Sequence, residues 1–129
     1  MHTKPILCLD FDGVCHSYTS GWQGATCIPD APVSGLFEFL EAAAESFTIA
    51  IYSARSHQEG GREAMQTWFE DQLCTRWIET GNRELCRNVQ LTFPKEKPPA
   101  RVTLDDRALT FTGTWPAVEV LKTFKPWNK

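Results

Sequence analysis

The stretch ILCLDFDGV, residues 6–14, decides the fold expected for this chain. Its first four residues are apolar without alternation, which is typical of a strand buried on both faces of a parallel sheet. Asp10 and Asp12 follow at the end of that run, and Gly13 then allows a tight turn and a close approach of backbone to a ligand. The stretch therefore predicts a buried strand that delivers two carboxylates to one place.

Helices and strands are expected to alternate along the rest of the chain. Apolar residues at helical spacing predict helices over residues 33–47, 63–78 and 116–124. Short apolar runs predict strands over residues 47–52, 89–93 and 101–104, with 109–112 as a further candidate to extend the sheet. Residues 13–32 read as a long loop or small hairpin, which in so small a protein is more often functional than passive.

This alternation implies right-handed crossovers and an α/β fold. We expect a three-layer αβα, Rossmann-like arrangement with a mostly parallel sheet and helices on both faces. The length of 129 residues suits one domain, residues 1–129, with one hydrophobic core.

Composition and charge exclude several classes of protein. No apolar stretch is long enough to span a membrane, and the N-terminus lacks the features of a secretory signal. The net charge is −3 and the basic residues are scattered, which argues against broad electrostatic capture of nucleic acid. Five cysteines without CxxC spacing favour reduced thiols and a cytoplasmic location over a disulfide framework or a structural zinc site.

Polar side chains gather at one edge of the predicted sheet. Asp10 and Asp12 follow the first strand, Ser53 follows the second, and Asp105 and Asp106 follow the fourth. Ligands of open α/β sheets bind beyond the carboxyl ends of the strands, so these groups are expected to share one site. Clustered carboxylates repel one another and need a cation or raised pKa values. All-oxygen donors favour a hard cation, and Mg²⁺ is the usual partner of phosphate chemistry.

These residues resemble four motifs of the haloacid dehalogenase superfamily. DFDGV at residues 10–14 resembles the first motif, and Ser53 at the end of an apolar strand resembles the second. A lysine ahead of the last strand resembles the third, and Leu104-Asp105-Asp106 the fourth. The intervals between the motifs leave no room for a lid. The resemblance therefore implies a small phosphatase-like member without a cap domain.

The resemblance also implies a Mg²⁺-dependent phosphohydrolase that acts on a phosphomonoester. Asp10 would be the nucleophile that forms an aspartyl-phosphate, and Asp12 would be the general acid and base. Mg²⁺ would be held by Asp10, by the backbone carbonyl of Asp12, and by Asp105 or Asp106, with the direct ligand of that pair left open.

Ser53 and a lysine would bind the transferring phosphoryl group. Lys97 is favoured over Lys95, because the residues after Lys97 lead directly into the fourth-motif strand. Gly13 and Ala54 would border the substrate. Arg55 is either a phosphate ligand or a surface ion-pair former.

Several alternatives remain open. The aspartyl-phosphate could pass to an alcohol, which would make the protein a phosphotransferase, or the fold could serve as a non-catalytic metal- and phosphate-binding module. A receiver domain fits less well, since its acidic pair precedes the phosphorylated aspartate. The expected partner is a phosphorylated substrate, small or as large as a nucleic-acid end, a nucleotide or a protein, and a homo-oligomer is compatible with the sequence.

The remaining candidates have plain structural interpretations. His16 and His57 are expected to be solvated loop residues, and Arg107 is expected to pair with a neighbouring carboxylate. Trp22 is expected to tack the loop to the core, with a stacking platform for a base as the alternative. Packing of the C-terminal helix is expected for Trp115, Phe124 and Trp127.

Overall fold

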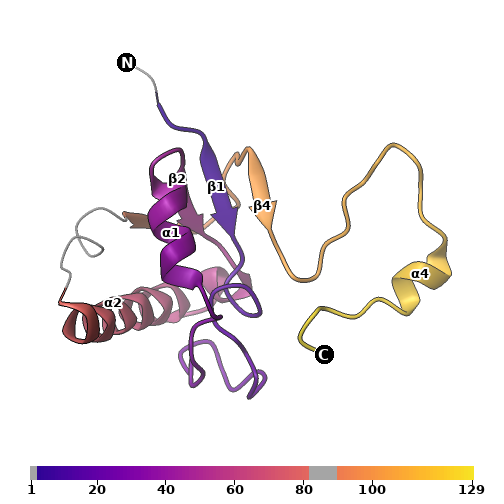
Figure 1. Ribbon diagram of the computed structural model, residues 1–129. Coiled ribbons are helices and arrows are strands. Elements are labelled where there is room, and N and C mark those ends of the chain that lie inside the picture. Colours follow the sequence, from indigo (N-terminus) through magenta and orange to yellow (C-terminus); the bar gives the residue numbers. More distant parts are fainter. Residues whose placement is uncertain (1–2, 82–89) are drawn as a thin grey trace.

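The computed structural model describes residues 3–81 and 90–129, which form an α/β fold on a four-stranded, wholly parallel sheet (Figure 1). The strand order is β3-β2-β1-β4. The strands are β1 (Ile6–Leu9), β2 (Thr48–Ile51), β3 (Leu91–Thr92) and β4 (Val102–Leu104). The helices are α1 (Leu36–Ala44), the short 3₁₀ helix η1 (Ala54–His57), α2 (Gly61–Thr80) and α4 (Val118–Lys122). The prediction of an α/β fold with a parallel sheet is confirmed.

Strand β1 lies at the centre of the sheet and is buried on both faces, as its continuous apolar sequence predicts. Leu7 and Leu9 belong to the main hydrophobic core. Cys8 lies between them, so it faces the other side of the sheet, and only 1% of its surface is exposed. Because β1 pairs with both β2 and β4, the residues that follow all three strands meet at one edge.

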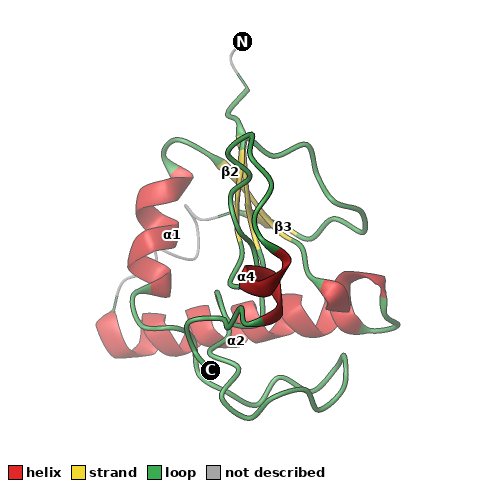
Figure 2. Ribbon diagram, turned by 90° about the vertical axis from the view of Figure 1, so that its right-hand side faces the viewer, coloured by secondary structure: helices red, strands yellow, loops and turns green. Residues whose placement is uncertain are grey.

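The core joins the sheet to α1 and α2. Figure 2 shows α1 alongside the strands and α2 running across them. Helix α1 contributes Phe37 and Leu40, and α2 contributes Met65, Trp68 and Phe69, all of them buried. An ion pair between Arg76 and Glu38, at 2.7 Å, also links the two helices. In the part of the chain that the structure describes, no helix is both long and apolar enough to cross a membrane.

Several boundaries differ from the prediction. Helix α1 begins at Leu36 and not at residue 33, because Gly35 has a left-handed backbone with φ of 85°. Helix α2 extends two residues beyond the predicted range at each end. The predicted strand over residues 89–93 is reduced to β3 within the described residues, and Val89 lies outside them.

The C-terminal segment differs most from the prediction. Residues 109–112 form no strand, because after β4 the chain turns away from the sheet (Figure 1). The predicted helix over 116–124 is reduced to α4, since Ala117 still has an extended backbone. The expected packing is also wrong, because Trp115, Phe124 and Trp127 are all exposed.

Candidate active site

The turn after β1 sends its side chains alternately into the core and toward a pocket. Phe11 is fully buried and meets Trp68 and Phe69 edge-on, with ring centroids 5.2 and 5.8 Å away. Asp10 and Asp12, on either side of Phe11, line a pocket at the carboxyl end of the strand. The buried phenyl ring therefore anchors the turn that carries both carboxylates.

Asp10, Asp105 and Asp106 form an acidic cluster. One carboxylate oxygen from each residue lies within 4.8 Å of the other two. The backbone N–H of Asp10 donates to the Leu104 carbonyl at 3.0 Å, so the ends of β1 and β4 are held side by side. The structure thus brings together three of the residues that the sequence predicts as metal ligands.

The acidic cluster suits a hard divalent cation. Asp106 Oδ1 is buried and has no hydrogen-bond partner in the described part of the chain. A buried carboxylate oxygen without a donor is costly unless a cation meets it. The donors are all oxygen atoms, which is the ligand type that Mg²⁺ and Ca²⁺ prefer.

The electrostatics of Asp10 agree with this interpretation. Burial, followed by the charges of Asp105 and Asp106, raises the pKa of Asp10 from 3.8 to about 7, against a lowering effect of a backbone hydrogen bond. A cation beside the three groups would favour the ionised form. The charge state of Asp10 therefore depends on what binds at the acidic cluster.

Asp12 has a different environment, in which His16 and Arg55 hold both of its oxygens. Arg55 Nε donates to Oδ2 at 2.9 Å, and the terminal nitrogen Nη2 donates to Oδ1 at 3.1 Å. His16 Nδ1 lies 2.9 Å from Oδ1. Burial opposes ionisation of Asp12, but the hydrogen bonds from His16 and Arg55 outweigh it, so the pKa of Asp12 lies below 3.8.

The tautomer of His16 follows from its second contact. The backbone N–H of Asp30 donates to His16 Nε2 at 3.0 Å, so Nε2 is an acceptor. In the neutral ring Nδ1 then carries the proton and donates it to Asp12. His16 is fully buried, and the expectation of a solvated loop histidine is wrong, because the loop folds over it. His57, by contrast, is exposed as expected.

Arg55 ties the loop of residues 13–32 to the site. Its Nη1 donates to the carbonyl oxygens of Gly24, Ala25 and Cys27 at 2.8, 2.9 and 3.2 Å. The Arg55 side chain is fully buried, so the surface ion-pair interpretation is wrong. Its guanidinium is engaged by Asp12 and by loop carbonyls, a role for which the sequence carries no sign.

The pocket has a volume of about 170 Å³. Its lining consists of Asp10, Asp12, Tyr18, Trp22, Ser53, Ala54, Asp106 and Arg107. The predicted residues Ser53 and Ala54 thus lie with the two aspartates. Ser53 also caps η1, where its Oγ accepts from the backbone N–H of Arg55 at 3.0 Å.

Gly13 lies directly against the acidic cluster. Its φ is 84°, in the left-handed region, and a Cβ at this position would collide with Asp106 Oδ2. Only glycine fits this position without a shift of its neighbours. The DFDG turn is therefore matched to the aspartate pair that follows β4.

The predicted lysines lie farther out. Lys95 and Lys97 are both exposed on the segment between β3 and β4, and neither lines the pocket. Burial raises the pKa of the Cys8 thiol, and the charge of Lys97 partly offsets this rise.

Three features of the site were missed or misjudged from the sequence. Trp127 is 114 positions from Gly13, yet its indole N–H donates to the Gly13 carbonyl at 2.8 Å. Tyr18 has a positive φ of 63°. Arg107 lines the pocket, and its side chain forms no ion pair in the described part of the chain, contrary to expectation. The sequence carries no signal for any of these features.

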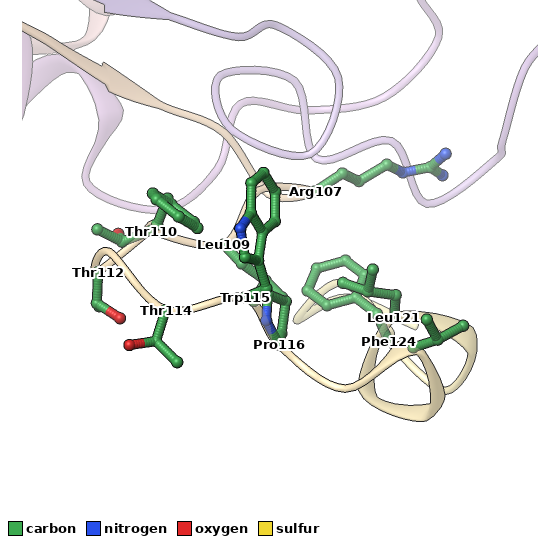
Figure 3. A pocket seen from close by; sticks show the side chains of 11 residues that line it. Arg107, Leu109, Thr110, Thr112, Thr114, Trp115, Pro116, Leu121 and Phe124 are labelled. Atoms are coloured by element: carbon green, nitrogen blue, oxygen red, sulfur yellow. The ribbon is translucent and has the colours of Figure 1, made fainter.

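A larger cavity of about 940 Å³ lies in the C-terminal segment (Figure 3). Leu109, Trp115, Leu121 and Phe124 are among its lining residues, and no Asp or Glu is. Without a carboxylate it lacks the charged oxygen ligands that hold a hard cation, and it has no aspartate that could form an aspartyl-phosphate. The smaller pocket at the sheet edge is therefore the candidate active site.

Comparison of the chain with family models, with curated proteins and with solved structures returns no match. The function of the protein must therefore be inferred from the residues of the site.

Proposed function

We propose that this chain is a phosphohydrolase of the haloacid dehalogenase type, which hydrolyses a phosphomonoester with the aid of Mg²⁺. Its fold would then be the three-layer αβα arrangement of that superfamily, without a cap domain. The observation that carries the proposal is the acidic cluster of Asp10, Asp105 and Asp106 at the carboxyl edge of a parallel sheet. The unpartnered buried oxygen of Asp106 and the close fit of Gly13 support it.

Mg²⁺ would be held by the carboxylates of Asp10, Asp105 and Asp106 and by the backbone carbonyl of Asp12. When bound, it would offset the negative charge of the phosphoryl oxygens and of the acidic cluster. Asp106 borders both the pocket and Gly13, which favours it as a direct ligand. Because the pKa of Asp10 is raised to about 7, the same cation would also keep Asp10 ionised.

Ionised Asp10 would attack phosphorus, so that an O–P bond forms to its carboxylate while the bond to the ester oxygen breaks. The leaving oxygen would take a proton from the minor, protonated form of Asp12, because the lowered pKa of Asp12 leaves most of this carboxyl ionised. In the second step water attacks phosphorus, Asp12 takes its proton, and phosphate and free Asp10 result. His16 and Arg55 hold Asp12 ionised and oriented, which suits its part in this second step.

Ser53 at the end of β2 would donate a hydrogen bond to the phosphoryl group, and it lies in the same pocket as Asp10. Lys97 would supply positive charge by extending over the site from its exposed position. The small pocket encloses the phosphoryl end only, so substrates as large as a nucleic-acid end or a protein remain compatible with the site.

Phosphate release from phenyl phosphate tests the proposal, with Mg²⁺ and with excess chelator. Wild type should release phosphate only with Mg²⁺, and Asp10→Asn should lose about a thousandfold or more of kcat, since no oxygen of comparable nucleophilicity remains. Asp71→Asn makes the same chemical change at an exposed position on α2 and serves as the matched control.

Release that persists in chelator would contradict the metal assignment. Asp10→Asn activity within about tenfold of wild type, equivalent to about 1.4 kcal/mol of barrier, would exclude Asp10 as the nucleophile. Release of a new phosphoester when an alcohol is supplied would identify a phosphotransferase instead.

A further inference from the structure

The candidate pocket is too small to enclose a substrate of nucleotide size. At about 170 Å³ it falls below the roughly 300 Å³ of pockets that enclose drug-sized ligands. Asp10 is partly buried, whereas 47% of the Trp22 surface is exposed. The phosphoryl end therefore fits beside Asp10, and the organic group must lie at the opening, where Trp22 and Tyr18 are.

Trp22 packs against the guanidinium of Arg55. The guanidinium carbon of Arg55 lies 4.7 Å from the centroid of the Trp22 ring. Arg55 is in turn fixed by Asp12 and by the loop carbonyls, so it is a rigid base for the indole. Because the Arg55 cation lies over one face of the indole, a second planar group would stack on the opposite face.

The position of Trp22, together with its exposure, argues against a purely structural role. Trp115 and Trp127 are more exposed, at 83% and 66%, but neither of them lines the candidate pocket, whereas Trp22 does. Trp22 has its cation–π contact and is still about half exposed, at the opening of the pocket that contains Asp10. A large aromatic surface left open beside a reactive carboxylate is typical of a binding surface.

Tyr18 gives an independent observation. It is the one non-glycine residue with a positive φ in the described part of the chain. That conformation is unfavourable for a bulky side chain, and such residues concentrate at ligand sites. The Tyr18 ring meets the His16 ring edge-on, with centroids 6.0 Å apart, and His16 is bonded to Asp12. The strained backbone therefore holds a second aromatic ring beside the catalytic turn.

We infer that Trp22, with Tyr18 in the lining of the same pocket, binds a planar aromatic ring carried by the phosphomonoester, such as a nucleobase or a phenyl ring. The inference rests on the proposed function for the phosphoryl end and adds the class of its organic group. Every nucleobase can stack on an aromatic side chain with similar strength. We therefore expect the protein to select a ring over an aliphatic chain, but not to select one base over another.

Equilibrium binding of three phosphates tests this inference. Ribose 5-phosphate and adenosine 5′-monophosphate differ only by the base, and phenyl phosphate carries a ring without ribose. Calorimetry with Mg²⁺ on the full chain carrying Asp10→Asn avoids turnover. We expect adenosine monophosphate to bind about tenfold more tightly than ribose 5-phosphate, since stacking on an aromatic side chain contributes this order of affinity.

Trp22→Leu removes the aromatic face and should abolish most of the preference, whereas Trp22→Phe should keep it. Trp115→Leu, the same change at an exposed tryptophan outside the candidate pocket, is the matched control. A tighter binding of phenyl phosphate together with adenosine monophosphate would show that any ring suffices, and tighter binding of adenosine monophosphate alone would identify a nucleobase.

Equal binding of adenosine monophosphate and ribose 5-phosphate to the Asp10→Asn chain would overturn the inference without any change at Trp22. A preference that survives Trp22→Leu would also overturn it. The two proposals fail separately: ring-selective binding without phosphate release contradicts the proposed function alone, and phosphate release without ring selectivity contradicts this inference alone.

Discussion

Arg55→Met is expected to destabilise the protein far more than the loss of a surface arginine. The substitution keeps an unbranched side chain as far as the position of Nε but removes the charge and every donor. Asp12 would retain its hydrogen bond with His16, and the loop carbonyls of Gly24, Ala25 and Cys27 would lose the donor that they share.

The magnitude follows from burial. The Arg55 side chain has no exposed surface, and that of Asp12 is 17% exposed. Removing one partner of a buried ion pair costs about 3–5 kcal/mol, because the other charge stays buried without its counter-charge. The hydrogen bond that Asp12 keeps with His16 places the expected loss at the lower end of this range. Since domains are stable by about 5–15 kcal/mol, such a loss is a large part of the total.

Urea denaturation followed by circular dichroism measures the effect, with Arg76→Met as the control. Arg76 pairs with Glu38 at 2.7 Å, but the two side chains are 27% and 62% exposed, so its loss should cost below about 1 kcal/mol. The pKa of Asp12 is held below 3.8, so the Arg55 contribution is complete above that pH and shrinks as the pH falls through the folded-state pKa. Equal unfolding midpoints for the two variants at neutral pH would refute this reasoning.

Three further predictions concern the turn after β1. Gly13→Ala should destabilise the protein more than Gly35→Ala. Both glycines have φ near 85°, so an alanine at either position pays about 1–2 kcal/mol for a left-handed backbone, but only at Gly13 would the Cβ also meet another residue. Equal losses of stability in urea would contradict this prediction. Mg²⁺ should bind about tenfold more weakly at pH 6 than at pH 8, as measured by calorimetry, because a proton competes with the cation at Asp10, whose pKa is raised to about 7. An affinity for Mg²⁺ that does not change with pH would contradict this prediction. Phe11→Ala should lower the free energy of unfolding by about 3–5 kcal/mol, measured by thermal or urea unfolding, and far more than Phe39→Ala at a half-exposed position on α1. A small loss of stability in Phe11→Ala would show that the Phe11 ring does not anchor the turn.

The central part of the fold could be predicted from sequence because it depends on short-range pattern. The run Ile6–Leu9 is apolar at every position, which a strand exposed on one face would not require, and it is indeed the central strand. The chain order of β1, β2 and β4 then dictates that Asp10, Ser53 and Asp106 come to one sheet edge, and all three line the same pocket.

The surroundings of Asp12 could not be predicted, because they depend on contacts between distant residues. Arg55 reaches carbonyls 28 to 31 positions away, and a backbone carbonyl carries no sequence signal of its own. The burial of His16 has the same origin, since it follows from the path of the loop past Asp30. A sequence pattern gives the length of a loop but not the side on which it folds.

At Leu109-Thr110-Phe111-Thr112 the local sequence pattern predicts a strand that does not form. Its period of two is that of a strand, but a strand forms only where a neighbour offers hydrogen bonds. After Asp105 and Asp106 the chain leaves the sheet, so Leu109 and Phe111 remain exposed. Local pattern was sufficient for the strands inside the sheet and insufficient for the segment beyond it.

The central claim is that Asp10 becomes covalently phosphorylated. The most direct measurement is to quench wild-type protein during turnover of phenyl phosphate with Mg²⁺, reduce it with borohydride, and examine the peptide containing Asp10 by mass spectrometry. An aspartyl-phosphate is reduced to homoserine, so homoserine should appear at position 10 only when substrate and Mg²⁺ are both present. Steady phosphate release with unmodified Asp10 in every quenched sample would contradict the account, because water would then attack the substrate directly.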